Sequence, residues 1–326
     1  MKLQHCYLPV LLAGILYSAD IGGPIAGYAT DSSQTQLRAI LGVPGAFAFS
    51  APLALTSGVS RLRLAPGQDY AIAERSGDAP VILTLHSGSV DRVIPIDGAM
   101  AMSDWVAFSP RAGSTMLISS EAHRLQVLTG LPGSPRIRTD IDLNRLPEAP
   151  ATGAVSEDGG LVVLASRTTL YRLSDGGDAQ LLLSLGSIPS VSLVNATDVA
   201  VADSSTGAVH VVHNIASKAE AHVVVSGLAN IGDLFPSQDG KSLFVAQREE
   251  GAVRSVDLAS GEVRTYATPA GRIELLPLRN RDTFLLAAES GKPGWVFYRD
   301  GLEGRVVFIP AIEGRATEIP VRRTAR

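Results

Sequence analysis

The sequence contains a single cysteine, Cys6, among its 326 residues. Cys6 lies in an N-terminal stretch that we expect to be removed, and without that stretch the mature chain has no thiol. The lack of thiols excludes disulfide bonds, thiolate metal sites and cysteine nucleophiles. Stability must therefore come from the apolar core, and 45% hydrophobic residues are enough to build a large one.

The sequence has little net charge and no apolar run long enough to cross a bilayer. A formal charge of −4 gives no general attraction to nucleic acid or anionic lipid. The apolar run Leu8 to Leu16 follows Lys2 and precedes the small residues Ser18 and Ala19. This pattern predicts a secretory signal over residues 1–19, and hence a secreted or periplasmic protein without a transmembrane segment. The alternative is that the stretch forms an ordinary buried strand.

Motifs for several common chemistries are missing as well. The sequence has no Gly-x-Ser-x-Gly turn, no Gly-x-x-x-x-Gly-Lys-Ser loop and no Gly-x-Gly-x-x-Gly between a strand and a helix. His210 and His213 are three residues apart and point to opposite faces of a predicted strand, whereas His210 and His222 are expected on neighbouring strands. We interpret them as surface histidines rather than metal ligands.

What the sequence does contain is a repeat of about 43 residues. Each copy has a short apolar strand, a turn and a second apolar strand. A third and a fourth strand follow, as at Ala252–Asp257 and Glu262–Tyr266. The copies occupy residues 57–98, 99–146, 147–186, 187–227, 228–269 and 270–310. Short strands with this period predict an all-β fold, a β-propeller of four-stranded antiparallel blades.

A further, incomplete copy lies before the first repeat. Residues 24–52 supply three strands, and the C-terminal strand 316–321 is expected to supply the fourth. Pairing the N- and C-terminal strands in one blade closes the ring and removes free sheet edges. We therefore predict seven blades in a single domain over residues 20–326. The alternative is six blades with an N-terminal hairpin.

Two segments carry a resemblance to a known superfamily. Val106-Ala107-Phe108-Ser109-Pro110 and the stretch from Pro236 to Ala246 resemble the strand–SPDG–strand core of seven-bladed propellers with WD40-like or YVTN-type repeats. The Trp-Asp and Gly-His dipeptides of true WD40 blades are absent. Taken over the whole mature chain, the sequence looks like that of a secreted bacterial propeller. The resemblance implies a fold, not an activity.

The predicted site is at one mouth of the central channel. The first strand of each blade lines this channel, so residues five or six positions before each aligned turn should converge there. The candidates with functional side chains are Arg61, Asp104, Trp105, Asp233 and Glu274. An aromatic ring beside charges suits a small ligand. We predict no cofactor; the alternative is calcium, which a cluster of carboxylates can hold. The alternative is that these side chains cap strand ends and remain solvated.

The sequence thus predicts a monomeric, extracytoplasmic and non-catalytic propeller that binds a protein, peptide or glycan. The alternative is a hydrolase of the lactonase type, which some YVTN-like propellers resemble. It would use Asp104, Asp233 and Glu274 together with a metal or a histidine base. A quinone-dependent dehydrogenase is a third hypothesis, but its tryptophan docking motifs are missing from a chain with two tryptophans.

Overall fold

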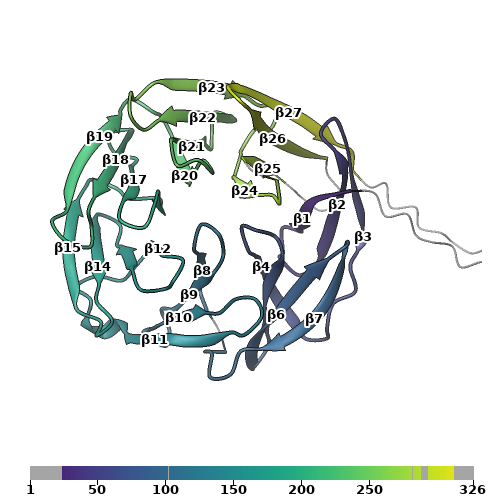
Figure 1. Ribbon diagram of the computed structural model, residues 1–326, viewed down its shortest axis with the longest axis horizontal. Helices are drawn as coiled ribbons and strands as arrows, with labels where there is room; N and C mark the ends of the chain where they lie inside the picture. The colour runs from purple at the N-terminus through teal and green to yellow at the C-terminus, as the bar shows by residue number, and fades with distance from the viewer. Residues whose placement is uncertain (1–23, 102, 281, 288–292, 312–326) are drawn as a thin grey trace, which may run out of the picture.

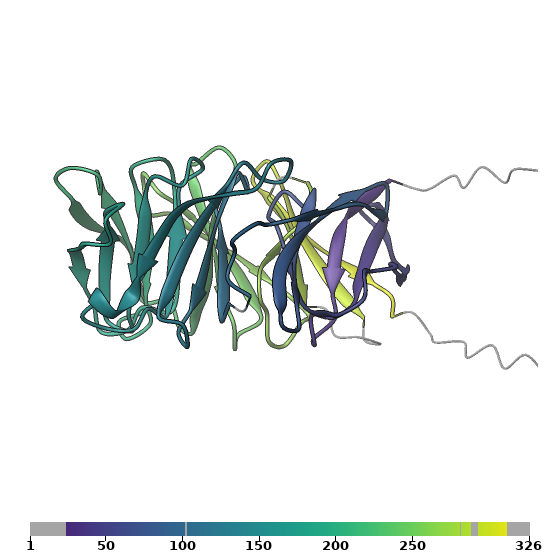
Figure 2. The ribbon, with the colours of Figure 1, turned by 90° about the horizontal axis from the view of Figure 1, so that it is seen from below.

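The chain forms a ring of seven β-sheets around a central axis (Figure 1). The structure, a computed structural model, describes residues 24–101, 103–280, 282–287 and 293–311. We number the sheets as blades 1 to 7 in chain order. Seen from the side, the blades stand in a single layer and their strands run across its thickness (Figure 2).

Blade 1 has three strands in the described residues, and blades 2 to 7 have four each. The strands of blades 1 to 3 are β1 (Ile25–Thr30), β2 (Leu37–Val43), β3 (Ala46–Pro52), β4 (Val59–Leu64), β5 (Tyr70–Arg75), β6 (Asp78–His86), β7 (Ser89–Pro95), β8 (Trp105–Phe108), β9 (Ser114–Ser119), β10 (Arg124–Thr129) and β11 (Arg136–Asp142). Those of blades 4 and 5 are β12 (Thr152–Val155), β13 (Val162–Ala165), β14 (Thr169–Leu173), β15 (Ala179–Ser184), β16 (Val191–Leu193), β17 (Val199–Asp203), β18 (Ala208–His213) and β19 (Glu220–Val225). Those of blades 6 and 7 are β20 (Ile231–Pro236), β21 (Ser242–Gln247), β22 (Ala252–Asp257), β23 (Val263–Ala267), β24 (Leu276–Pro277), β25 (Thr283–Ala287), β26 (Gly294–Asp300) and β27 (Glu303–Ile309). A turn of 3-10 helix, η1 (Leu143–Arg145), follows β11.

Strand order confirms the predicted all-β, seven-bladed propeller. In blades 2 to 7 the sheet order follows the chain, neighbouring strands are antiparallel, and the first strand lies nearest the centre (Figure 1). The predicted closing strand, residues 316–321, and the predicted signal, residues 1–19, lie outside the described residues. The described part of the chain holds no helix with the length and hydropathy needed to cross a membrane.

The second strands of blades 2 to 7 contain continuous apolar runs because both of their faces are buried. In β17, Val199 and Val201 pack in a cluster shared with blade 4. The intervening residues Ala200 and Ala202 pack in a cluster shared with blade 6. Since successive side chains of a strand point to opposite faces, a strand between two neighbouring blades must be apolar at every position.

Apolar clusters lie between each pair of neighbouring blades all the way around the ring. The cluster between blades 7 and 1 joins Leu278 and Leu285 to Ile40 and Phe47. Because burial of apolar surface is the main favourable term in folding, the two ends of the described chain are held together by the same kind of contact as every other pair of blades.

The turns between first and second strands of blades 4 and 6 share one hydrogen-bonding scheme. In blade 6 the Asp239 carboxylate accepts from the Ser237 hydroxyl at 2.6 Å and from Lys241 N at 3.0 Å. In blade 4, Asp158 accepts from the Ser156 hydroxyl and from Gly160 N at the same two distances. The Ser-x-Asp-Gly pattern therefore works as a closed local turn, which explains why it recurs in the sequence.

Blade 1 has a special arrangement at the inner edge of β1. The Gln68 side chain, from the turn between β4 and β5, accepts a hydrogen bond from Tyr28 N at 2.5 Å and donates to Tyr28 O at 3.1 Å. Its amide also donates to Pro277 O of blade 7 at 2.7 Å. Gln68 is buried, so one side chain satisfies backbone groups of two blades that would otherwise lose their hydrogen bonds.

Candidate functional site

The five predicted site residues lie at the beginnings of innermost strands, which surround the centre of the ring (Figure 1). Arg61 is on β4 and Asp233 is on β20, while Trp105 is the first residue of β8. Asp104 directly precedes β8, and Glu274 lies two residues before β24. They therefore come from blades 2, 3, 6 and 7.

Arg61 connects blade 2 to the segment that leads into blade 3. Its Nη1 donates to Ser103 O at 3.2 Å and lies 3.7 Å from a carboxylate oxygen of Glu74. Glu74 is buried and accepts a hydrogen bond from the Ser103 hydroxyl at 2.5 Å. The Arg61 side chain still keeps 40% of its surface exposed. Its guanidinium is thus held in place on one side and open to a ligand on the other.

Asp104 lies within the electrostatic reach of Arg61 and caps the end of β9. Its carboxylate accepts a hydrogen bond from Ser120 N. Hydrogen bonds from Ser120 lower the pKa of Asp104, and the positive charge of Arg61 acts in the same direction. A carboxylate with a lowered pKa is a weaker general base, so this environment suits holding a loop better than abstracting a proton.

The Trp105 side chain is partly exposed and partly packed between blades 3 and 4. Its half-buried side chain packs against a cluster that contains Met116 and Leu164. The second tryptophan, Trp295, packs on the cluster between blades 6 and 7 and makes an edge-to-face contact with Phe308, with ring centres 5.1 Å apart. Both indoles therefore contribute to contacts between or within blades.

Asp233 joins blade 6 to blade 7. One carboxylate oxygen lies 2.8 Å from Nη2 of Arg248, and the other accepts from Leu275 N at 3.1 Å. Gly232 makes room for this pair, because a Cβ there would lie 2.5 Å from Nε of Arg248. Glu274 is exposed. Among the described residues, no hydrogen bond or ion pair joins Asp233 or Glu274 to the group around Arg61.

The mouth is therefore held by two separate polar groups, one around Arg61 and one around Asp233. In each, a carboxylate is occupied by backbone N–H groups or by an arginine. Within the described ranges, no group of three or more His, Cys, Asp or Glu side chains is placed to hold a metal ion. The calcium site and the ligand site at Arg61, Asp104, Trp105, Asp233 and Glu274 stay predictions.

Two arginines near this mouth, Arg63 and Arg248, each have a buried Nε without a hydrogen-bond partner among the described residues, and neither was predicted from the sequence. Arg63 lies beside Arg61. It lies two residues after Arg61 on β4, on the same face of the strand. Its Nε is buried, and no hydrogen bond reaches it from the described part of the chain. Burial lowers the pKa of Arg63, the nearby charge of Arg61 lowers it further, and Glu74 opposes both. The available signal was the alternation Arg61-Leu62-Arg63 on a predicted innermost strand.

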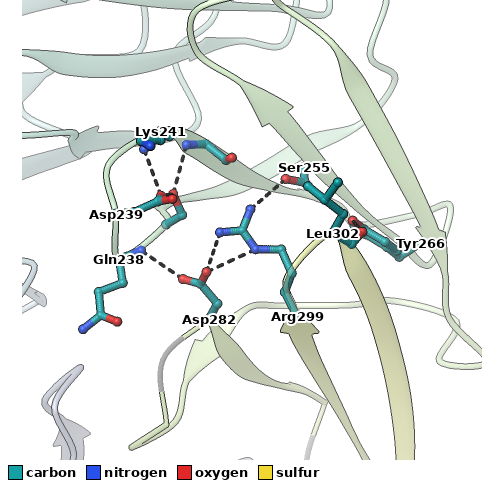
Figure 3. A network of polar contacts seen from close by, with 10 residues as sticks. Gln238, Asp239, Lys241, Ser255, Tyr266, Asp282, Arg299 and Leu302 are labelled. Atoms are coloured by element: carbon teal, nitrogen blue, oxygen red, sulfur yellow. Dashed lines mark hydrogen bonds and ion pairs between the residues drawn. The ribbon is translucent and has the colours of Figure 1, made fainter.

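A second polar network, also missed from the sequence, lies between blades 6 and 7 (Figure 3). Nη2 and Nε of Arg299 lie 2.5 and 3.1 Å from one oxygen of Asp282. The other oxygen accepts from Gln238 N at 2.9 Å. The two side chains are 11% and 16% exposed, and the guanidinium lies 4.7 Å from the ring centre of Phe244. A small recess of about 70 Å³ lies beside Arg299 and Tyr266. We interpret this network as a polar contact that holds blades 6 and 7 together, and we call the Arg299–Asp282 pair the clamp.

Comparison with known proteins shows the fold alone. No protein-family model and no curated protein matches the chain. A functionally unknown protein from Desulfotomaculum acetoxidans is 14% identical with a TM-score of 0.58, and the match covers 87% of this chain and 94% of that one. Hsv2 from Kluyveromyces lactis is 12% identical, with a TM-score of 0.53 and 73% coverage of each chain. The β-propeller domain of Cps50 (Swd1) from Myceliophteria thermophila is 10% identical, with a TM-score of 0.53 and coverages of 78% and 88%. What this chain shares with them is the architecture of the β-propeller.

Proposed function

We propose that this propeller is a non-catalytic binding scaffold, and that its ligand is a protein, peptide or glycan that presents an acidic group to Arg61 and Arg63. The observation that carries the proposal is the buried, unpartnered Nε of Arg63 beside a second, partly exposed guanidinium. Like charges so close together oppose each other, and a carboxylate or similar anion would offset that repulsion.

The energetics of Arg63 favour a role in binding over a role in folding. Burial removes hydration from the Arg63 guanidinium, no hydrogen bond reaches its Nε, and the charge of Glu74 offsets the loss only in part. Arginine is suited to bidentate recognition of carboxylates and phosphates. A side chain that weakens the fold but fits an anion is the kind of residue that a binding site retains at the expense of stability.

The same geometry supports binding in preference to lactone hydrolysis. The hydrolase alternative would use Asp104 and Asp233 as bases or metal ligands. Asp104 accepts from Ser120 N, and Asp233 is occupied by Arg248 and Leu275 N. These contacts support a structural use for both carboxylates.

The experiment compares the parent protein with Arg63→Met on an array of acidic and neutral peptides and glycans. We expect the parent to retain acidic members preferentially and Arg63→Met to lose at least tenfold in affinity for them. We expect the melting temperature of Arg63→Met to stay unchanged or to rise, because the variant removes a half-buried guanidinium whose Nε has no hydrogen-bond partner. The matched control is Arg305→Met, which removes an exposed arginine of β27 that pairs with Glu303 at 3.2 Å.

Two results would contradict the proposal. One is equal retention of acidic and neutral ligands by the parent. The other is a lower melting temperature for Arg63→Met together with unchanged binding, because that would make Arg63 a residue of the fold and not of the site.

We further propose that the protein acts outside the cytoplasm, after removal of residues 1–19. The support is the basic Lys2, the apolar run from Leu8 to Leu16 and the small residues that follow. N-terminal sequencing of the protein from fractionated cells tests this. A mature chain that begins near Asp20 in the extracytoplasmic fraction supports it, and an intact N-terminus in the cytoplasm overturns it.

A further inference from the structure

Two histidines meet on the outer part of blade 5, away from the starts of the innermost strands. His213 ends β18 and His222 is in β19, and their ring centres lie 5.5 Å apart with an angle of 50° between the rings. Nδ1 of His213 lies 2.9 Å from a carboxylate oxygen of Asp198, which comes from the turn between β16 and β17. His222 is exposed, and the His213 side chain keeps 43% of its surface exposed.

Strand register puts the two imidazoles on one face of the sheet. His213 lies opposite Glu220 and Val211 lies opposite His222, so His213 and His222 are diagonal neighbours. His210 lies opposite Val223, on the other face. The sequence predicts only that His210 and His222 lie on neighbouring strands; the register of the hairpin, which no local pattern fixes, places His213 beside His222 instead.

The spacing of the two rings fits a shared metal ion. A tetrahedral zinc ion with nitrogen ligands at about 2.0–2.1 Å places the centres of two coordinating imidazoles roughly 5 Å apart. The observed separation of 5.5 Å is close to this value. Small side-chain rotations would be enough to bring one nitrogen of each ring onto the same ion.

Asp198 occupies the position in which a carboxylate commonly accepts a hydrogen bond from a metal-binding histidine. A histidine that ligates a metal through one nitrogen usually donates its other N–H to a carboxylate, which fixes the ring and raises its basicity. The Asp198 carboxylate lies against Nδ1 of His213, so Nε2 is the nitrogen of that ring left for a metal ion.

We propose that His213 and His222 form a two-histidine site for a divalent transition-metal ion such as zinc, with Asp198 as the positioning residue. The remaining coordination positions are filled by water or by a group of a bound partner. Glu220, opposite His213, is paired with Lys218 at 3.2 Å and is not needed as a ligand. The site is separate from the channel mouth and does not depend on the function proposed above.

The test is a calorimetric titration of the metal-free full chain with zinc chloride. We expect one zinc ion per chain. His213→Asn and His222→Asn should each weaken zinc binding at least tenfold, and Asp198→Asn should weaken it about 10- to 100-fold, as is typical for the loss of such a partner.

His210→Asn is the matched control, because His210 is on the same strand but faces the other side of the sheet. It should bind zinc like the parent. Asp198 also forms hydrogen bonds within its own turn, so its substitution affects folding as well as the site. His222 is exposed, and His222→Asn therefore tests the site with the least effect on folding. Thermal melting of each variant measures that effect. The proposal is overturned if the parent binds no zinc, or if His213→Asn and His222→Asn bind zinc as tightly as His210→Asn does.

Discussion

At the scale of single residues, two side chains that connect neighbouring blades come from turn residues with positive φ. The fourth turn residue has positive φ, and glycine is present there at Gly159 and Gly240, with φ of 71° and 67°. Gln68 occupies the same position with φ of 53°, and Asp282, one residue later in the turn of blade 7, has φ of 48°. A side chain is disfavoured in this conformation. Both of these side chains reach a neighbouring blade, which offsets the cost.

We expect Gln68→Ala to destabilise the protein by about 1–3 kcal/mol, because it leaves buried backbone groups of Tyr28 and Pro277 without partners. Gln68→Gly should recover part of the loss through the backbone but none of the hydrogen bonds. Urea unfolding of the three proteins measures these differences. Gln34→Ala is the control, since Gln34 also has positive φ, at 58°. A similar loss in the control would show that conformation, and not the amide, is what matters at Gln68.

At the scale of the elements, neighbouring blades are held by apolar clusters and by a few polar clamps. The pair Arg299–Asp282 spans blade 7 and also reaches Gln238 N and Phe244 of blade 6. A pair this deeply buried is weakly screened by salt. Removing only one partner leaves the other as an uncompensated buried charge, which is far more costly than replacing both.

A double-mutant cycle tests the clamp. We expect Arg299→Met to cost about 3–5 kcal/mol, since it leaves the Asp282 carboxylate buried and removes the contact with Phe244. Asp282→Asn should be destabilising as well, and the double variant should lose clearly less than the sum of the two. Chemical unfolding at low and high salt measures all four proteins. Additive losses would mean that the two side chains do not act as a pair.

Strands and turns were predictable from the sequence because their causes are local. The apolar run of β17 and the Ser-x-Asp-Gly turn at Ser237 follow from burial on both faces and from side-chain hydrogen bonds within a few residues. The burial of Arg63 and the contacts of Gln68 and Arg299 depend on which blades adjoin and on exact register. Such contacts join residues far apart in the chain, so no local sequence pattern predicts them.

At the scale of the whole molecule, carboxylates that accept hydrogen bonds are distributed around the ring. The pKa is lowered below its usual value of 3.8 at nine aspartates. They are Asp31, Asp104, Asp140, Asp142, Asp158, Asp198, Asp203, Asp239 and Asp257. At Asp31, Asp198 and Asp203 burial is the largest influence and opposes the shift, but hydrogen bonds together outweigh it. They belong to blades 1, 3, 4, 5 and 6, so acid should act on several blades at once.

The unfolded chain binds protons at these aspartates more readily than the folded chain, so their stabilising effect is present above about pH 4 and is lost as the pH falls further. We expect the urea midpoint to fall steeply below that pH. The double variant Asp158→Asn/Asp239→Asn should be less stable than the parent at about pH 7, and the difference should shrink towards about pH 3, where the parent carboxyls become protonated. A difference that stays constant across this range would show that the two turns are stabilised by their shape and not by their charge.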